Sequence, residues 1–173
     1  SLDIIFYLVI CLTVWAIIIY NLLVRDKNRV LTAWSDIDVQ LKRRYALVPK
    51  LVEAVKQYAA YESSTIKAVT EMHLTGEKIS AVADRSNPEM QFGGQLRQLI
   101  ALAEDYPDLK ANQSFLELQR ELTEIEKHIQ YARRYYNGCV RNLNVRIESF
   151  PDMHLAKQFY FVQAAFFEFE HGI

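Results

Sequence analysis

The chain has 173 residues, a formal net charge of −1, four prolines, five glycines and two cysteines. This length allows one domain together with an anchor or tail, and a net charge of −1 provides no overall basic field that would indicate nucleic-acid binding. Cys11 and Cys139 lie in unrelated surroundings, which predicts neither a disulfide framework nor a cysteine metal site. We expect both cysteines to be buried as small apolar side chains.

The first predicted element is an apolar helix over residues 4–24, which contain no charged side chain. Such a helix is roughly 31 Å long, enough to cross the hydrocarbon core of a bilayer. Three other interpretations fit less well: a buried soluble helix of this length is unusual, a cleaved signal peptide needs a basic start, and a lipoprotein signal needs a small residue at Ile10. We therefore predict an uncleaved membrane anchor, with aromatic residues near both interfaces. The membrane-spanning residues include Ile4, Tyr7, Cys11, Trp15, Ile19, Tyr20 and Val24.

The flanks of this segment predict its orientation. Arg25, Lys27 and Arg29 follow it closely, whereas only Asp3 precedes it. Because Lys and Arg concentrate on the cytoplasmic side of membrane helices, we expect the N-terminus outside and the rest of the chain in the cytoplasm.

A long seam of apolar residues follows the anchor, with steps that alternate between four and three. This spacing is typical of a helix that packs against partner helices in a left-handed bundle. Pro49 interrupts the seam without changing its phase, so we predict one long helix with a kink near residues 45–49, continuous with the anchor. The seam consists of Val30, Trp34, Ile37, Leu41, Arg44, Val48, Leu51, Val55, Tyr58, Glu62, Thr65, Val69 and Met72.

Two further helices are predicted after a loop over Ala83–Gly94, where Pro88 and a Gly pair favour a break. The shorter helix has the apolar spacing Phe92, Leu96, Leu99, Ala103 and Tyr106. Pro107 closes this helix or opens the next one. The longer helix carries a second seam, which ends before Pro151: Phe115, Leu118, Leu122, Ile125, Ile129, Ala132, Tyr136, Cys139, Leu143, Arg146 and Phe150. No segment has the alternation of a strand, so the fold class is all-α, an antiparallel helical bundle.

The chain resembles the LemA family of bacterial membrane proteins. The resemblance is carried by AWSDIDVQLKRRYALVPKLVEAVKQYA (Ala33–Ala59), by the stretch from Leu99 to Pro151, and by the anchor followed by YNLLVRDKNRV. It implies a single membrane crossing, an N-terminus outside, a LemA-like four-helix arrangement in the cytoplasm and no established catalytic activity.

A polar stripe lies beside the second seam at seven-residue intervals. Its members are Asn112, Gln119, Glu126 and Arg133, with Asn137 and Asn144 close by. We interpret it as a hydrogen-bonded flank that fixes helix register, with a binding site as the alternative. Arg44 belongs to the same set of structural polar residues because it lies on the first seam, where burial without a carboxylate would be costly. Glu126 is the predicted partner, with Asp38 and Glu121 as alternatives.

The sequence contains little that indicates an active site. A di-iron site in a helical bundle needs two Glu-x-x-His motifs, whereas Glu124 and His128 are four residues apart and the sequence has no second Glu-x-x-His motif. Motifs for nucleophilic catalysis and phosphate binding are missing as well. We therefore predict a protein that is not an enzyme, with no cofactor, no metal and no small-molecule substrate.

The C-terminal residues are rich in aromatic side chains, which would be costly to leave in water. They could fold back on the bundle, form a contact between subunits or dock on the membrane surface. The candidate subunit-contact residues are Phe159, Tyr160, Phe161, Phe166, Phe167 and Phe169.

These observations predict three segments: a transmembrane anchor (1–24), a cytoplasmic helical bundle (25–151) and an aromatic tail (152–173). The predicted function is that of a homo-oligomeric scaffold at the bacterial cytoplasmic membrane, whose partners are the lipid bilayer and further copies of the chain. The alternatives are an adaptor for a membrane protease, transporter or signalling protein and, more remotely, a metal enzyme of the helical-bundle type.

Overall fold

The computed structural model describes residues 2–58, 64, 66, 67, 69–71 and 82–167. Its helices are α1 (Leu2–Lys56), α3 (Val82–Leu102), the 3-10 turn η1 (Ala103–Asp105), α4 (Pro107–Lys110), α5 (Gln113–Glu148) and α6 (Asp152–Gln158). The described residues contain no strand, so the predicted all-α fold is confirmed. Pro107 occupies the first turn of α4, where its missing N–H costs nothing.

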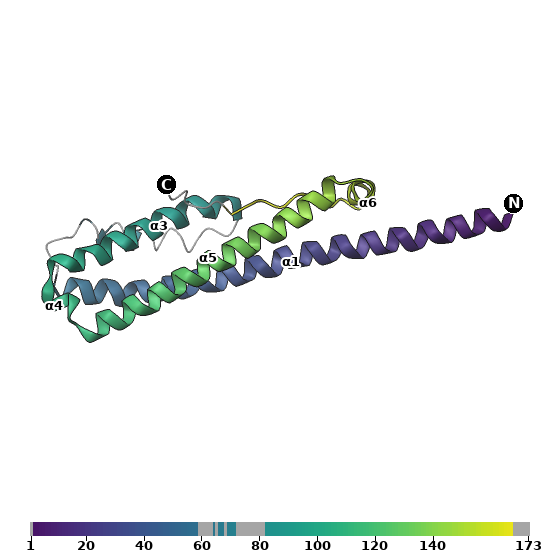
Figure 1. Ribbon diagram of the computed structural model, residues 1–173. Coiled ribbons are helices and arrows are strands. Elements are labelled where there is room, and N and C mark those ends of the chain that lie inside the picture. The colour runs from purple at the N-terminus through teal and green to yellow at the C-terminus, as the bar shows by residue number, and fades with distance from the viewer. Residues whose placement is uncertain (1, 59–63, 65, 68, 72–81, 168–173) are drawn as a thin grey trace. The chain divides into compact units, whose positions relative to one another are not determined.

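The chain forms two compact units. The first consists of Ser1–Ser35 with Arg134–Phe166, and the second of Asp36–Arg133 with Phe167–Ile173. Helices α1 and α5 contribute to both units (Figure 1). The three-part division predicted from the sequence stays a prediction.

The second unit packs α3 and α5 against α1. Arg44 of α1 bonds Glu126 of α5, and Tyr58 in the turn after α1 bonds Asn112 just before α5. Helices α1 and α5 therefore run antiparallel here. Many of the buried side chains belong to the predicted apolar spacings, among them Leu41, Leu51 and Val55 on α1, Leu96 and Leu99 on α3, and Leu122 and Ile125 on α5.

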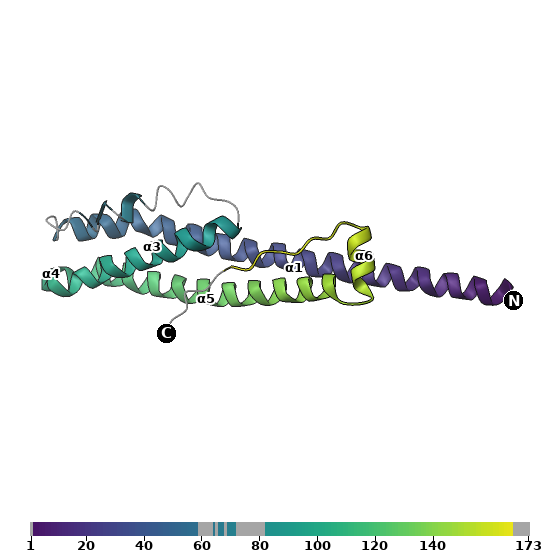
Figure 2. The same cartoon turned by 90° about the horizontal axis from the view of Figure 1, so that it is seen from above.

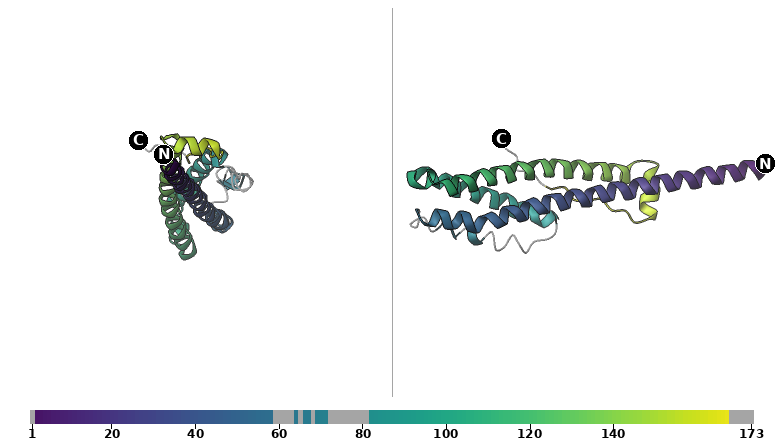
Figure 3. Two further views of the ribbon diagram at one scale, coloured as in Figure 1. Left: turned by 90° about the vertical axis from the view of Figure 1, so that its right-hand side faces the viewer. Right: turned by 90° about the horizontal axis from the view of Figure 1, so that it is seen from below.

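The first unit pairs the N-terminal part of α1 with the end of α5, again antiparallel, because Asp26 bonds Arg146 and the Trp34 ring contacts Tyr136. Helix α6, which the sequence analysis did not predict, lies across α1 (Figures 2 and 3). Its Ala156 is buried with Ile19 and Leu23 of α1. The chain then returns along α5, where residues 164 and 165 are hydrogen bonded to it.

Helix α1 passes through Pro49, as predicted, but it ends at Lys56. The expected single helix as far as Met72 is therefore wrong, since residues 57 and 58 form a turn in which Tyr58 N–H donates to the carbonyl of Val55. An apolar spacing reports which side chains face a core, and it can keep its phase where the helix itself stops. Val69 is buried as the spacing predicts. Glu62, Thr65 and Met72 lie outside the described residues, and the kink near Pro49 stays a prediction.

The predicted loop over Ala83–Gly94 is also wrong, because these residues belong to α3. Helix α3 buries Glu89 and Phe92, and this packing outweighs the low helix propensity of Pro88 and the two glycines.

Candidate functional site

A buried ion cluster joins three helices of the second unit. Arg44 of α1 donates from Nη1 to Oε1 of Glu126 on α5 at 2.8 Å, and from Nη2 to Oε2 of Glu89 on α3. The Tyr45 hydroxyl donates to the other oxygen of Glu89, and the guanidinium of Arg44 lies 5.0 Å from the centre of the Phe92 ring. Every charged group in this cluster has an opposite partner, which indicates a structural tie between helices.

Glu126 is the partner of Arg44 that the sequence predicted, and this prediction is confirmed. Glu89 was missed because it lies in the stretch interpreted as a loop. The signal that could have found it is the spacing of Glu89 and Phe92, which are three residues apart and therefore share one helical face.

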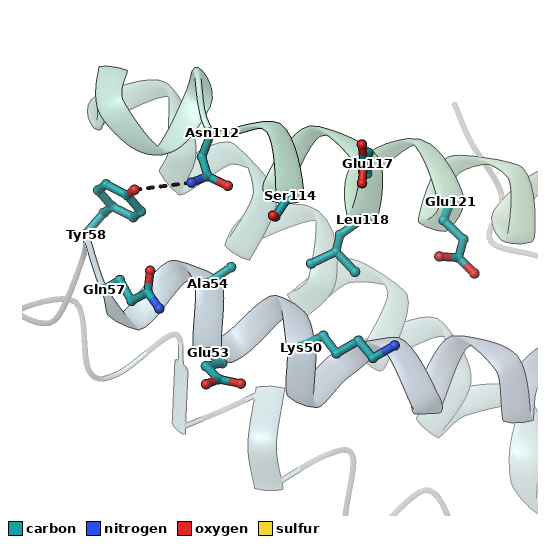
Figure 4. Close-up of a pocket in the computed structure, with 10 residues that line it drawn as sticks. All are labelled: Lys50, Glu53, Ala54, Gln57, Tyr58, Asn112, Ser114, Glu117, Leu118 and Glu121. Carbon is teal, nitrogen blue, oxygen red and sulfur yellow. Dashed lines mark hydrogen bonds between the residues drawn. The ribbon is translucent and has the colours of Figure 1, made fainter.

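An open groove lies in the second unit between the last turns of α1 and the first turns of α5, with a volume of about 410 Å³ (Figure 4). Glu53 on one wall and Glu117 and Glu121 on the other provide three carboxylates, against the single ammonium group of Lys50. At one end, Asn112 Nδ2 donates to the Tyr58 hydroxyl at 3.3 Å. The lining therefore has an excess of negative charge that suits a basic ligand.

The residues of the polar stripe have several different partners. Asn112 caps α5, since its Oδ1 accepts from the N–H of Phe115 at 3.1 Å. Glu126 binds Arg44, and Arg133 lies over the Phe167 ring, 4.6 Å from its centre. Gln119 and Asn137 are half-buried on α5.

Asn144 holds the C-terminal chain. Its Nδ2 donates to the carbonyl of Ala164 at 3.0 Å, and its Oδ1 accepts from the N–H of the same residue at 2.9 Å. The neighbouring Tyr136 hydroxyl donates to the carbonyl of Ala165 at 2.7 Å. Burial raises the pKa of Tyr136, because the phenolate would lose hydration. Together these bonds fix two successive residues of the chain against α5.

A second ion cluster joins three helices of the first unit. Arg146 of α5 donates from Nε to Asp26 of α1 at 2.7 Å and from Nη1 to Asp152 of α6 at 2.9 Å. The hydrogen bond to Asp26, with that to Asp152, raises the pKa of Arg146. Arg146 lies on the second seam, and its two partners were not predicted from the sequence.

The tail aromatics differ in their surroundings. Phe159 and Phe161 pack against Tyr20, with ring centres 4.9 and 6.0 Å from it, respectively. Phe167 is fully buried, so it offers no surface to another molecule in this conformation. Tyr160 and Phe166 are exposed, whereas Phe169 lies outside the described residues.

The predicted anchor is exposed on nearly all sides. Among the described residues, α1 is the one helix long and apolar enough to cross a membrane, and its apolar window is only 6% buried. Ile4, Tyr7, Cys11, Trp15 and Tyr20 are exposed, Val24 is half-buried, and Ile19 is buried against α6. The prediction for cysteine burial is therefore right for Cys139 and wrong for Cys11, because no other described element covers this part of α1.

The described residues contain no group of three or more His, Cys, Asp or Glu side chains arranged to hold a metal ion.

Comparison with known proteins adds a family and several relatives. A family model with the description LemA family matches residues 33–172. Protein LemA of Metamycoplasma hominis is 28% identical over 152 residues, which cover 86% of this chain and 68% of that protein. The magnetosome proteins MamQ 1 and MamQ 2 of Paramagnetospirillum magneticum are each 30% identical over 77 residues, 44% of this chain and 28% of theirs.

Proposed function

The chain belongs to the LemA family, and from this premise we propose that it is a membrane-anchored scaffold that assembles with further copies of itself. The observation that carries the proposal is the exposed apolar segment at the start of α1, which continues as the same helix into the bundle. Lipid is the environment that makes such a surface favourable.

Exposed apolar side chains outside the anchor support assembly. Leu31 and Val39 on α1 and Tyr131 and Val145 on α5 are all exposed in the single chain. Phe166 adds an exposed ring next to the residues that Tyr136 and Asn144 hold in place. Confinement of copies in one membrane plane raises their local concentration, so weak contacts of this kind suffice for assembly.

The proposed orientation has the N-terminus outside and the bundle in the cytoplasm of a bacterium, with the anchor in the inner membrane. Arg25, Lys27 and Arg29 support it, because they lie just beyond the apolar segment. A cysteine that replaces exposed Tyr131 should react with an impermeant maleimide only after the membrane is opened. Labelling of intact spheroplasts would reverse the proposed orientation.

Mass and particle shape in mild detergent test the scaffold proposal. The full chain should form a large closed assembly, and Phe166→Asp should reduce its mass because a charge enters the contact. Ala165→Asp is the matched control, since it adds the same charge at the exposed neighbouring residue. A monomer or small oligomer for the unmodified chain would overturn the proposal.

The groove of Figure 4 favours a second candidate function, an adaptor that binds a basic segment of a membrane protease, transporter or signalling protein. A photoreactive residue at Ser114 in the groove should then crosslink to one such partner in stoichiometric amounts. Glu117→Lys with Glu121→Lys should abolish that crosslink and leave the mass of the homo-oligomer unchanged. Crosslinks between copies alone would favour the scaffold.

We propose a role without catalysis, which agrees with the names of these relatives, since none of the three names a reaction. Metal analysis of the purified protein tests the remote alternative of a metal enzyme. Stoichiometric iron or manganese would support that alternative.

A further inference from the structure

The end of α6 has a conformation that its sequence does not favour. Tyr160 has a φ of 57°, in the left-handed region, where Gly is the preferred residue. The N–H of Phe161 donates to the carbonyl of Ala156 at 2.9 Å and that of Tyr160 to Lys157 at 3.3 Å, the two bonds of a Schellman motif. A tyrosine at this position is less favourable than glycine, so we look for a contact of its ring that compensates for the strain.

That contact is not packing within the chain, because the Tyr160 side chain is 88% exposed. Phe150 and Val162 are each 78% exposed, and Phe159 is exposed as well. We name these four residues, Phe150, Phe159, Tyr160 and Val162, the aromatic foot. So much exposed apolar surface within residues 150–162 marks a contact with another molecule or with a membrane.

The aromatic foot is attached to α1 at the end of its apolar segment. Ala156 of α6 is buried with Ile19 and Leu23 of α1, and the Phe159 ring packs against Tyr20. All three α1 residues belong to the last turns of the segment predicted to lie in the membrane. The aromatic foot is therefore at the level where a lipid bilayer changes from acyl chains to headgroups.

A groove on this side of the first unit has the chemistry of an acyl-chain site. It has a volume of about 350 Å³ and lies between α1, which contributes Ala16, Ile17 and Tyr20, and the Leu155 and Phe159 side chains. Its walls are mostly apolar, with the polar groups of Thr13 and Asn21 at the α1 side. The Thr13 hydroxyl is already bonded to the carbonyl of Val9 at 2.8 Å, so it presents little polarity to the groove.

Basic side chains accompany this surface. Lys27 lies 5.9 Å from the centre of the Phe161 ring, Arg25 and Arg29 are its exposed neighbours on α1, and Lys157 is exposed on α6. Such residues bind the phosphate groups of anionic lipids at a cytoplasmic membrane surface.

We propose that the aromatic foot inserts into the phospholipid interface and that the groove between α1 and α6 holds a lipid acyl chain. The occupant is the bilayer around the anchor, and the inference rests on the proposed membrane crossing by α1. Tyrosine is enriched at membrane interfaces because its ring is apolar and its hydroxyl can remain hydrated. The bilayer thus provides the contact that offsets the unfavourable backbone conformation of Tyr160.

Spin-label accessibility in lipid bilayers tests the proposal on the full chain. The label is attached to Val162→Cys in a chain with Cys11→Ser and Cys139→Ala, reconstituted in bilayers of phosphatidylcholine and phosphatidylglycerol. Collisions with oxygen, which dissolves in lipid, should exceed those with a water-soluble nickel chelate severalfold. Tyr131→Cys on α5 is the matched control, an exposed aromatic position where the nickel collisions should be the more frequent.

A label at Leu8→Cys separates this inference from the proposed function. Lipid contact at Leu8 with water contact at Val162 would overturn the aromatic foot alone, whereas water contact at Leu8 would overturn the membrane crossing as well. Strong spin–spin broadening between copies at Val162, without lipid contact, would overturn the inference and assign the surface to a second copy of the chain.

Tyr160→Gly provides a second test that does not depend on misfolding. The variant should melt in detergent at the same temperature as the unmodified chain or higher, because glycine adopts a positive φ without strain. In bilayers, its Val162 label should move toward water. A label depth that does not change would overturn the role assigned to Tyr160.

Discussion

Each unit of the molecule contains an arginine that binds two carboxylates and thereby ties a third helix to α1 and α5. In the second unit Arg44 holds α3 through Glu89, and in the first unit Arg146 holds α6 through Asp152. The Arg44 side chain is 1% exposed, and that of Arg146 is 26% exposed. The same set of one guanidinium and two carboxylates is therefore a buried core element in one unit and a partly hydrated junction in the other.

This difference in burial sets the expected energetics. Removing one partner from a buried ion pair leaves an uncompensated charge, at a cost of about 3–5 kcal/mol. Where water reaches the remaining group, hydration replaces part of the lost interaction and the cost falls toward that of an ordinary hydrogen bond, about 1 kcal/mol. Substitutions in the two clusters should therefore differ in magnitude although the chemistry is alike.

Arg44→Glu should have the largest effect, because it places three carboxylates together in the core of the second unit. The expected cost exceeds the roughly 3–5 kcal/mol of a broken buried pair, which is a large part of the stability of a domain. Circular dichroism melting in detergent should show loss of the cooperative transition. Arg43→Glu is the control, since Arg43 is exposed and bonds only Gln40 in the described structure. A stable Arg44→Glu variant would contradict the assignment.

Glu89→Gln and Glu126→Gln measure separately what each carboxylate contributes to the Arg44 cluster. Glu89 is fully buried and accepts from both Arg44 and Tyr45, whereas the Glu126 side chain is 36% exposed. We expect a loss of about 2–4 kcal/mol for Glu89→Gln and under about 1 kcal/mol for Glu126→Gln. Thermal melts of the two variants measure the difference, and equal losses would show that burial does not control the cluster.

Asp152→Asn tests the more hydrated cluster of the first unit. The expected loss is about 1 kcal/mol, because the amide oxygen can still accept from Arg146 and water reaches the guanidinium. Hydrogen exchange of the α6 amides should become faster, while exchange in α3 should not change. The control is Asp36→Asn at an exposed position of α1. A loss as large as that of Glu89→Gln would remove the distinction between the clusters.

Tyr136 provides a comparison at a buried polar group without formal charge. Tyr136→Phe should cost about 1 kcal/mol, since it removes one hydrogen bond to the carbonyl of Ala165. The folded pKa is raised above the usual 10.0, so the folded state holds its proton more tightly than the unfolded state. The stability that the protonated Tyr136 side chain contributes is fully present below pH 10.0 and is lost as the pH rises through the folded pKa.

The melting temperature should therefore fall as the pH rises above 10.0, and it should fall less in Tyr136→Phe. Tyr131→Phe is the control, because Tyr131 is exposed on the same helix. Identical pH profiles for all three proteins would show that burial of Tyr136 does not contribute.

The parts of the fold that could be predicted from the sequence are those that depend on periodic burial. The seam residues Leu41, Leu122 and Ile125 are buried because a repeat of three and four places them on one helical face. The pairing of Arg44 with Glu126 followed from the cost of an unpaired buried charge, which is a rule independent of fold.

What the sequence could not provide depends on contacts between distant segments. Pro88 and the glycines of α3 indicate a loop locally, and only the contacts of Glu89 and Phe92 with α1 show why a helix forms there. Likewise, α6 is too short for a periodic signal. Its place on α1 depends on the contact of Ala156 with α1 residues more than a hundred positions earlier in the chain, and on the bond between Asp152 and Arg146 of α5.

The contacts of Asn144 determine which amino acids can replace Ala164 in the C-terminal chain. Its amide group bonds both the N–H and the carbonyl of Ala164, so it recognises the backbone of one residue and does not contact the side chain through these bonds. Many residues at position 164 satisfy such a requirement equally well, and proline, which has no N–H to donate, is the one that fails it. The tail can thus change its chemistry through evolution while its path along α5 stays the same.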